Sequence, residues 1–307
     1  MNTVLKRALL ANAAFSALCG LGLVVLGGGL AELIGLGSPI VYRVIGLGLA
    51  LFAGVVGWSA TRTPINAFVA SLISAADLLW VLGTAIVIVL TYPSLRPLGI
   101  VVMLAVAALV LGLALRQLHG IELTFAVPGK PHTSRLCVAV ATPVSADDLW
   151  LRIADLGNIQ RYSPNLARVS LRNQARAGVD AVRECTSRTG QTWAEHCTRF
   201  DPVARAIDMR FLASEAGFPY PFGTMTGGWA VVPLAAGSEV TIWFEVTPKY
   251  AVLEPFILAL MSKDLAQSFG DIVTRMVMDA QGAPTPTPMP VNVLAAQHGV
   301  SYRLARC

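Results

Sequence analysis

Residues 135–164, RLCVAVATPVSADDLWLRIADLGNIQRYSP, decide the fold of the second half of this chain. Apolar residues alternate with smaller ones over residues 136–140, the period of a half-buried strand, and Pro143 ends that strand because it lacks a backbone donor. Ser145 precedes Asp148 by three positions, a spacing typical of a capping box at the start of a helix. The stretch therefore predicts a strand, a turn, a helix and a short second helix.

Residues 134–281 resemble the START-like (SRPBCC) superfamily, in particular its polyketide cyclase/dehydrase-like branch with the Bet v 1-type helix-grip fold. The resemblance implies an α+β domain, in which an antiparallel sheet wraps around a long C-terminal helix and encloses a cavity. These motifs specify a fold more than a chemistry. They are the early strand, Ala146-Asp147-Asp148-Leu149-Trp150, Asp155-Leu156-Gly157-Asn158, Arg161-Tyr162-Ser163-Pro164, Asp201-Pro202 and the long final helix.

The composition indicates a membrane protein. The chain has 307 residues, of which 55% are hydrophobic and only 13% are charged, against about a quarter charged in soluble proteins. This deficit of charge lies almost wholly before residue 119. The formal charge of +5 is modest and its basic residues are scattered, which argues against a nucleic acid as partner.

Four apolar segments before residue 119 are each long enough to cross a bilayer: residues 8–31, 41–60, 67–90 and 98–118. The first is longer than the apolar region of a cleaved signal peptide, so we expect it to be retained. The predicted organisation is a four-helix transmembrane domain at 1–119, a linker at 120–133, a START-like ligand-binding domain at 134–282 and a Pro-rich tail at 283–307. Residues 283–290, APTPTPMP, have Pro at every second position and predict an extended linker, followed by a short helix at 291–297.

The basic residues near the ends of the predicted spans are unevenly distributed: Lys6, Arg7, Arg62 and Arg116 on one side, against Arg43 and Arg96 on the other. The positive-inside rule therefore predicts that both termini, and with them the soluble half, lie in the cytoplasm. The five cysteines show no paired spacing, which fits a reducing compartment.

Asp77 lies near the middle of the third predicted span. A carboxylate there costs roughly 2.5 to 3.5 kcal/mol on insertion scales, so we expect its side chain to face the other helices. Two interpretations follow from the sequence. Asp77 either forms a proton or ligand site within the bundle, or locks the packing of the helices as a protonated or hydrogen-bonded carboxyl group.

In the soluble half, turn residues separate strands predicted at 167–172, 179–187, 192–200, 204–212, 224–233 and 239–247, and a helix-period apolar stripe predicts a final helix at 254–279. Two of these strands present apolar residues on one face, and the resemblance implies that this face lines a ligand cavity. The alternative is that the same side chains fill an ordinary core. The ligand-binding candidates are Trp193, Ile207, Met209, Phe211, Phe222, Trp229, Ile242, Phe244 and Phe269.

Catalytic signals are sparse. Glu195 and Arg199 share one face of a predicted strand with Trp193 and Cys197. If that face is concave, Glu195 is a candidate acid or base with a raised pKa; if it is the outer face, the two form a surface ion pair. The four histidines have no ligand spacing and no Cys-x-x-Cys is present, so the sequence predicts no metal and no cofactor.

The sequence thus predicts a membrane-anchored protein that binds an apolar small molecule or a lipid in the cavity of a helix-grip domain. One alternative is a polyketide cyclase/dehydrase-like enzyme acting on a hydrophobic substrate. Another is a structural or regulatory membrane protein whose helix-grip domain is filled. The sequence leaves the oligomeric state open.

Overall fold

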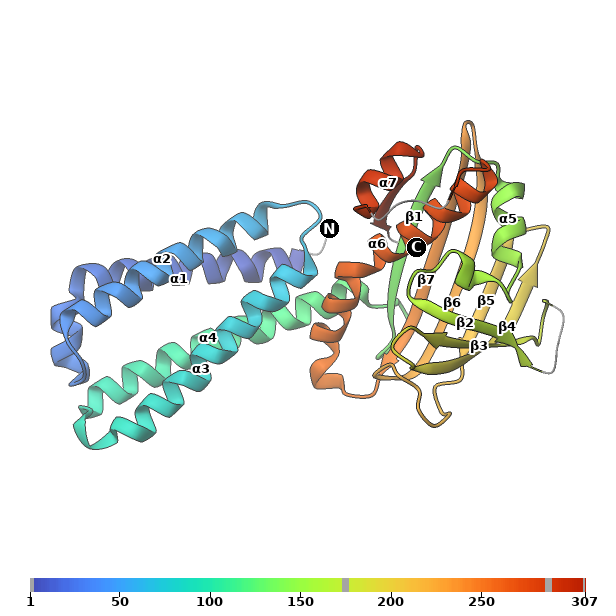
Figure 1. Cartoon of the computed structure of the whole chain (residues 1–307). Helices are drawn as coiled ribbons and strands as arrows, with labels where there is room; N and C mark the ends of the chain where they lie inside the picture. Colours follow the sequence, from blue (N-terminus) through green and yellow to red (C-terminus); the bar gives the residue numbers. More distant parts are fainter. Residues whose placement is uncertain (1–2, 173–176, 285–288, 306) are drawn as a thin grey trace. The chain divides into compact units, whose positions relative to one another are not determined.

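A computed structural model describes residues 3–172, 177–284, 289–305 and 307 (Figure 1). The chain divides into two compact units. The first comprises Met1–Thr124 with Pro255–Ala259, and the second comprises Phe125–Glu254 with Leu260–Cys307.

Four long helices form the first unit: α1 (Thr3–Ile34), α2 (Pro39–Thr61), α3 (Ala67–Thr91) and α4 (Pro97–Phe125). Each is long and apolar enough to cross a bilayer, and each of the four predicted segments falls within one of them. Pro39 and Pro97 stand at the starts of α2 and α4, where a missing backbone N–H does no harm. Asn66 caps α3, because its side chain accepts hydrogen bonds from the N–H groups of Phe68 and Val69.

Glycines bring α1 close to its neighbours in this unit. A Cβ on Gly46 of α2 would lie 2.6 Å from the carbonyl oxygen of Gly20 in α1, and a Cβ on Gly120 of α4 would lie 2.7 Å from the Cα of Leu5. Such close backbone approach is typical of helices that pack in lipid, where small residues line the contact. Helix α1 is therefore packed against both α2 and α4.

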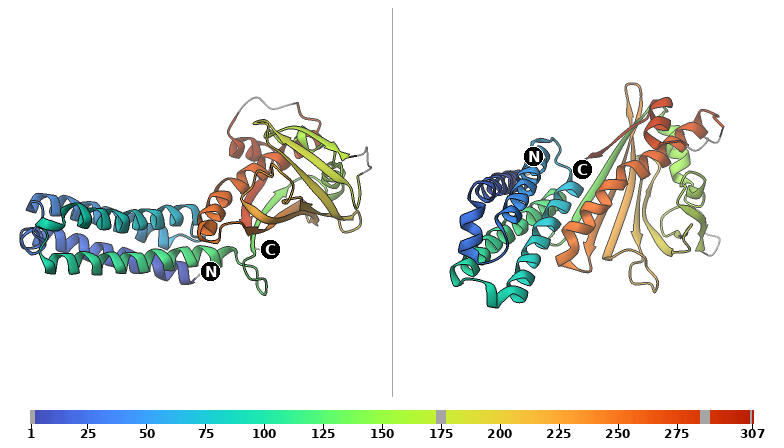
Figure 2. Two further views of the ribbon diagram at one scale, coloured as in Figure 1. Left: turned by 90° about the horizontal axis from the view of Figure 1, so that it is seen from below. Right: turned by 60° about the vertical axis from the view of Figure 1, so that its left-hand side comes forward.

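The second unit contains an antiparallel sheet of eight strands within the described residues, in the order β2-β3-β4-β5-β6-β7-β1-β8. The long helix α6 (Glu254–Ala280) lies across one face of this sheet (Figure 2). The predicted fold class, apolar helices followed by a helix-grip domain, is confirmed. The strands are β1 (Ser134–Thr142), β2 (Leu166–Leu171), β3 (Val182–Ser187), β4 (Thr192–Asp201), β5 (Ala206–Phe211), β6 (Phe222–Leu234), β7 (Gly237–Pro248) and β8 (Ser301–Ala305).

The segment at residues 135–164 forms the predicted succession of elements: β1, then α5 (Ala146–Ala154), then the short helix η2 (Ile159–Arg161). The Ser145 hydroxyl accepts a hydrogen bond from the N–H of Asp148 (3.2 Å) and so caps α5. Leu149, Trp150 and Ile153 are buried on one face of the helix. The local sequence is thus sufficient to specify this part of the chain.

Asp279, near the end of α6, connects that helix to α5 and η2. Its carboxylate accepts hydrogen bonds from Arg152 Nε (2.8 Å), an Arg161 guanidinium nitrogen (2.5 Å) and the Tyr162 hydroxyl (3.2 Å). The Arg161-Tyr162 pair in the sequence motif therefore has a structural role. It fixes the C-terminal end of α6 relative to the first helices of the domain.

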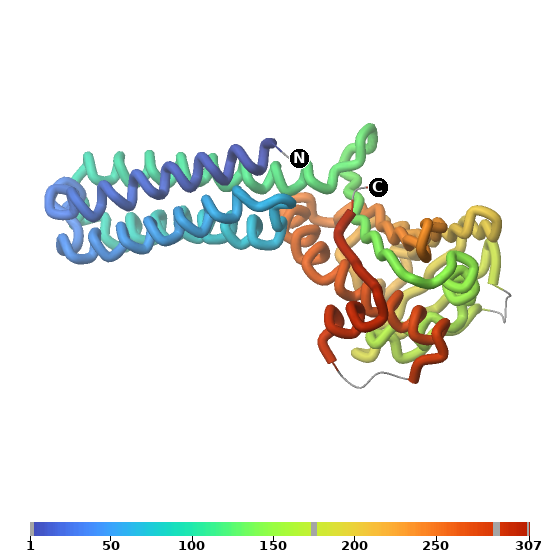
Figure 3. The backbone as a smooth tube through the Cα atoms, turned by 90° about the horizontal axis from the view of Figure 1, so that it is seen from above, coloured from blue at the N-terminus to red at the C-terminus, as the bar shows by residue number. Residues whose placement is uncertain are grey.

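The tail returns to the sheet. After α7 (Val291–Gln297), strand β8 pairs antiparallel with β1, with Cys137 opposite Ala305 (Figure 3). Tyr302 of β8 packs on Gly270 of α6, where a Cβ would lie 2.4 Å from the ring. The sequence predicted the short helix but no strand after it. Residues 285–288 of the predicted extended linker lie outside the described residues.

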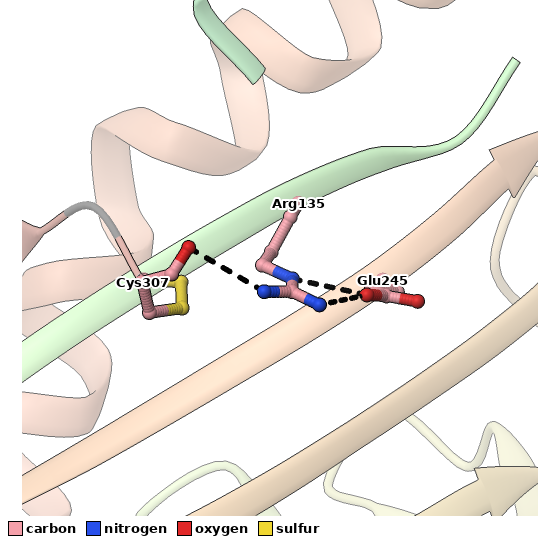
Figure 4. The surroundings of a disulfide bond; sticks show 4 residues. Arg135, Glu245 and Cys307 are labelled. Atoms are coloured by element: carbon pink, nitrogen blue, oxygen red, sulfur yellow. Dashed lines mark hydrogen bonds and ion pairs between the residues drawn. A yellow bond between two sulfur atoms is a disulfide. The ribbon is translucent and has the colours of Figure 1, made fainter. Parts of the chain in front are cut away.

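A disulfide joins Cys137 of β1 to Cys307, 170 residues apart in sequence, with a Cα–Cα distance of 6.2 Å. Beside it, Arg135 donates hydrogen bonds to the Glu245 carboxylate and, at 3.4 Å, to the carbonyl oxygen of Cys307 (Figure 4). The lack of paired cysteine spacing, which fits a reducing compartment, gave no sign of this bond. Sequence spacing could not reveal it, because β1–β8 pairing is what brings the two residues together.

Candidate functional site

The candidate site is the face of the sheet that α6 covers. Phe269 of α6 contacts Trp229 and Phe244 of the sheet, with ring centroids 5.4 Å apart in both pairs. Residues opposite one another on neighbouring strands share a face of the sheet. Glu195 is opposite Phe211, Met209 is opposite Gly227, and Gly227 is opposite Phe244. Because Phe244 contacts α6, these partners all lie on the covered face.

Aromatic rings form a continuous chain along this face. Trp193 contacts Tyr220 (5.6 Å between centroids), Tyr220 contacts Phe211 (6.4 Å), and Phe211 contacts Phe244 (6.2 Å), which meets Phe269. Edge-on and tilted pairs at these separations are favourable arrangements for aromatic side chains. Trp229 also contacts Phe269. We call four half-buried rings the aromatic face: Trp193, Phe211, Trp229 and Phe269.

The sequence-predicted ligand residues divide into two groups by burial. Four of them are the half-buried rings of the aromatic face. The other five, Ile207, Met209, Phe222, Ile242 and Phe244, are buried. The rings of the first group are partly accessible, whereas the side chains of the second group are closed off from solvent.

A buried ion pair lies at one end of this face. Arg183 of β3 stands opposite Glu195 of β4, and its Nε donates a hydrogen bond to Glu195 Oε2 (3.2 Å). Trp193 Nε1 donates to the other carboxylate oxygen (2.7 Å). The two charged side chains are only 11% and 6% exposed. Glu195 is therefore on the covered face, and both of its oxygens are engaged.

The structure does not bring Glu195 and Arg199 together. An irregularity between Cys197 and Arg199 shifts the β4–β5 register, so that strict alternation of faces does not continue to Arg199. Arg199 instead pairs with Asp201 (3.0 Å) at the surface, and its side chain is half exposed. The partner that sequence reasoning missed is Arg183. Only the β3–β4 register shows that it faces Glu195.

The electrostatics of this end keep the Arg183 guanidinium, the Tyr220 phenol and the Cys185 thiol protonated. Burial opposes the charge of Arg183, yet the adjacent Glu195 holds the pKa of that guanidinium above its ordinary value. Burial, with the nearby charge of Glu195, raises the pKa of Tyr220 to about 12. Burial, together with the Glu195 charge, also raises the pKa of the Cys185 thiol. Cys185 is therefore a poor nucleophile, and Tyr220 is a neutral phenol at physiological pH.

The Tyr220 hydroxyl has no hydrogen-bond partner among the described residues. It lies beside Trp193 and Phe211 and so belongs to the same end of the aromatic face. A neutral phenol that keeps its donor free can hydrogen-bond an oxygen of a bound molecule.

Asp77, the remaining sequence candidate, belongs to the helical unit and is only 4% exposed. Its Oδ2 accepts hydrogen bonds from Asn12 (2.7 Å) and Gln117 (2.9 Å).

Within the described parts of the chain, no group of three His, Cys, Asp or Glu residues is arranged to hold a metal ion.

Comparison with family models identifies residues 135–279, which match the family described as polyketide cyclase / dehydrase and lipid transport. These residues form a domain of that family. The polyketide cyclase/dehydrase domain thus begins in β1 and ends near the last turn of α6, while β8 lies beyond the matched residues. No curated protein sequence matches the chain.

Several solved structures are similar to about half of this chain at low sequence identity. The crystal structure of Ara h 8.0201 is 12% identical with a TM-score of 0.41, over 49% of this chain and 99% of that one. The Zhui aromatase/cyclase from Streptomyces sp. R1128 is 18% identical with a TM-score of 0.40, over 49% and 94%. Norcoclaurine synthase from Thalictrum flavum is 17% identical with a TM-score of 0.40, over 52% and 91%.

We predict that Glu195→Gln destabilises the protein strongly, because it leaves the buried Arg183 charge without a counter-charge. Breaking a buried pair in this way costs roughly 3–5 kcal/mol. The free energy of unfolding is measured by chemical denaturation of the purified full-length protein. Arg199→Gln is the matched control, since it breaks an exposed pair and should change little. Equal effects of the two changes would contradict the assignment.

Proposed function

We propose that the polyketide cyclase/dehydrase domain binds an apolar small molecule or a lipid between its aromatic face and α6. The observation that carries this proposal is the partial exposure of Trp193, Phe211, Trp229 and Phe269. These rings lie on the side of the sheet that a helix covers, yet they are not closed off as Ile207 and Ile242 are. Apolar ring surface left accessible to water favours an apolar partner.

The polar end of the face would orient the ligand. Glu195 has both oxygens engaged by Arg183 and Trp193, so it offers no free charge to a bound molecule. The Tyr220 hydroxyl offers one donor. A ligand with an apolar body and one oxygen acceptor matches this combination, and pockets for such ligands are usually apolar with few polar groups. The family description, which includes lipid transport, supports this ligand class.

In this proposal, helices α1–α4 hold the domain at a membrane. Apolar ligands partition into a bilayer, and a binding domain tethered at its surface meets them at high effective concentration. The working protein is then a membrane-anchored domain for apolar ligands, with residues 120–133 as the connection and residues 134–282 as the ligand-binding part.

We predict that the full-length protein binds a neutral apolar fluorescent probe such as N-phenyl-1-naphthylamine, and that Met209→Trp weakens this binding by roughly tenfold or more. Met209 lies on the covered face, opposite Gly227, so a larger ring there takes up the space of the ligand. Fluorescence titration of the detergent-solubilised protein measures the change.

The matched control is Arg210→Trp, which adds the same ring at the next residue. Arg210 is exposed on the opposite face of β5 and should leave binding unchanged. Absence of probe binding, or equal binding by wild type and Met209→Trp, would instead favour a filled domain with a structural or regulatory role.

An enzyme of the cyclase/dehydrase kind is the second candidate, and the free Tyr220 hydroxyl is the observation that favours it. A protonated phenol beside an apolar surface can act as a general acid toward a ketone or hydroxyl oxygen. Glu195 is less suited to act as a base, because its ion pair with Arg183 occupies it.

If the domain is an enzyme, Tyr220→Phe should lower turnover roughly 10²–10⁴-fold while leaving binding of the substrate nearly unchanged, because only the donor is lost. Mass spectrometry of a hydrophobic β-hydroxy ketone incubated with the protein detects loss of water. If the wild type binds the ketone but does not convert it, the result supports ligand binding and contradicts catalysis.

We also propose that both termini face the cytoplasm, on the strength of the basic residues at the ends of the helices. The Cys137–Cys307 disulfide favours the opposite side, since stable disulfides are rare in the cytosol. The expected result is that a tag after Cys307 resists protease added to intact cells, whereas a tag inserted at residues 35–38 is cleaved. Cleavage of the C-terminal tag, with protection at residues 35–38, would reverse the orientation.

A further inference from the structure

The helical unit contains a cavity of about 140 Å³ that residues of all four helices line. Its walls are largely apolar and include three aromatic side chains, Phe15 of α1, Phe52 of α2 and Trp80 of α3. Asp77 is the acidic residue in the lining. Trp80, one of these rings, is 38% exposed.

The hydrogen bonds of Asp77 occupy only one of its two oxygens. Oδ2 accepts from Asn12 Nδ2 (2.7 Å) and from Gln117 Nε2 (2.9 Å), whereas Oδ1 accepts none from the described part of the chain. The remaining oxygens of the two amides are themselves used. Ser16 donates to Asn12 Oδ1 (3.0 Å), and Ser74 donates to Gln117 Oε1 (3.2 Å). The network therefore orients Asp77 and leaves one oxygen available.

A role in packing alone does not account for this arrangement. Buried polar atoms in apolar surroundings are normally hydrogen-bonded, and a carboxylate within the membrane thickness is costly without a partner. Asp77 lines the cavity, so its free Oδ1 is open to a molecule there.

We propose that this cavity binds a small organic amine in its ammonium form. One N–H of the ammonium donates to Asp77 Oδ1, and the apolar body of the amine lies against Phe15, Phe52 and Trp80. Aromatic rings attract such cations through their faces, most strongly where water is excluded. A hard metal cation fits poorly, since it requires six or more oxygen ligands and these walls are apolar. The amine reaches the site from the bilayer, beside Trp80.

The experiment uses the purified full-length protein in lipid nanodiscs, titrated with benzylamine and with benzyl alcohol, its uncharged analogue of the same shape. Calorimetry or saturation-transfer NMR measures both affinities. We expect benzylamine to bind roughly tenfold or more tightly than benzyl alcohol. Asp77→Asn should remove this preference and leave the affinity for benzyl alcohol unchanged. The amide oxygen at residue 77 can still accept from Asn12 and Gln117, so the helices keep their packing.

Two further variants locate the site. Val106→Phe fills the cavity from α4, at a residue outside the hydrogen-bond network of Asp77, and should weaken the binding of both compounds. Asp264→Asn removes the same charge at an exposed position of α6 and should change neither affinity. The proposal is overturned if the wild type binds neither compound or binds them equally, or if benzylamine binding survives Asp77→Asn or Val106→Phe. If Asp77→Asn fails to fold, the proposal is still tested by two results: the ratio of the wild-type affinities for benzylamine and benzyl alcohol, and the effect of Val106→Phe.

Discussion

The hydrogen bonds at Asp279 are the constraint on which the helix-grip domain depends. They connect the C-terminal end of α6 to Arg152 of α5 and to the Arg161-Tyr162 pair that follows it. Charge-assisted hydrogen bonds have a defined direction and length, so they fix the position of the helix. Apolar contacts between a helix and a sheet are less directional and tolerate small shifts of the helix. Because α6 is held at this end, Phe269 near its middle meets Trp229 and Phe244, and the aromatic face becomes the covered one.

The tail adds a second constraint on the same helix. Strand β8 pairs with β1, and the disulfide secures the end of the chain to that strand. Tyr302 then packs on Gly270, one residue from Phe269, and no larger residue fits at that contact. The residues after the matched family domain therefore contribute to the position of the helix that covers the aromatic face. A truncation at residue 282 would remove this support.

The sequence was informative where structure depends on local patterns. The strand–helix start at residues 135–164, the apolar helices and the stripe of α6 all follow from periodicity and capping. The sequence did not predict contacts that depend on the pairing register of the strands. One example is the irregularity after Cys197, which separates Glu195 from Arg199. The Arg183–Glu195 pair and the disulfide depend on strand partners far apart in the chain, and no spacing in one sequence encodes them. Alternation of residues places side chains on a face but does not say which strand lies beside which.

Two of the buried carboxylates, Glu195 and Asp77, differ in the partners that they require. Glu195 has a full counter-charge in Arg183 and a hydrogen bond from Trp193, so its local charge is already balanced. A ligand on the aromatic face is then selected by shape and apolar area, with Tyr220 as a single donor. Asp77 has only neutral amide donors, and these share one of its oxygens. Neutral donors stabilise a carboxylate less than a cation does in a medium of low dielectric constant. The chain therefore combines a site that does not depend on ligand charge with one whose carboxylate requires a cationic partner.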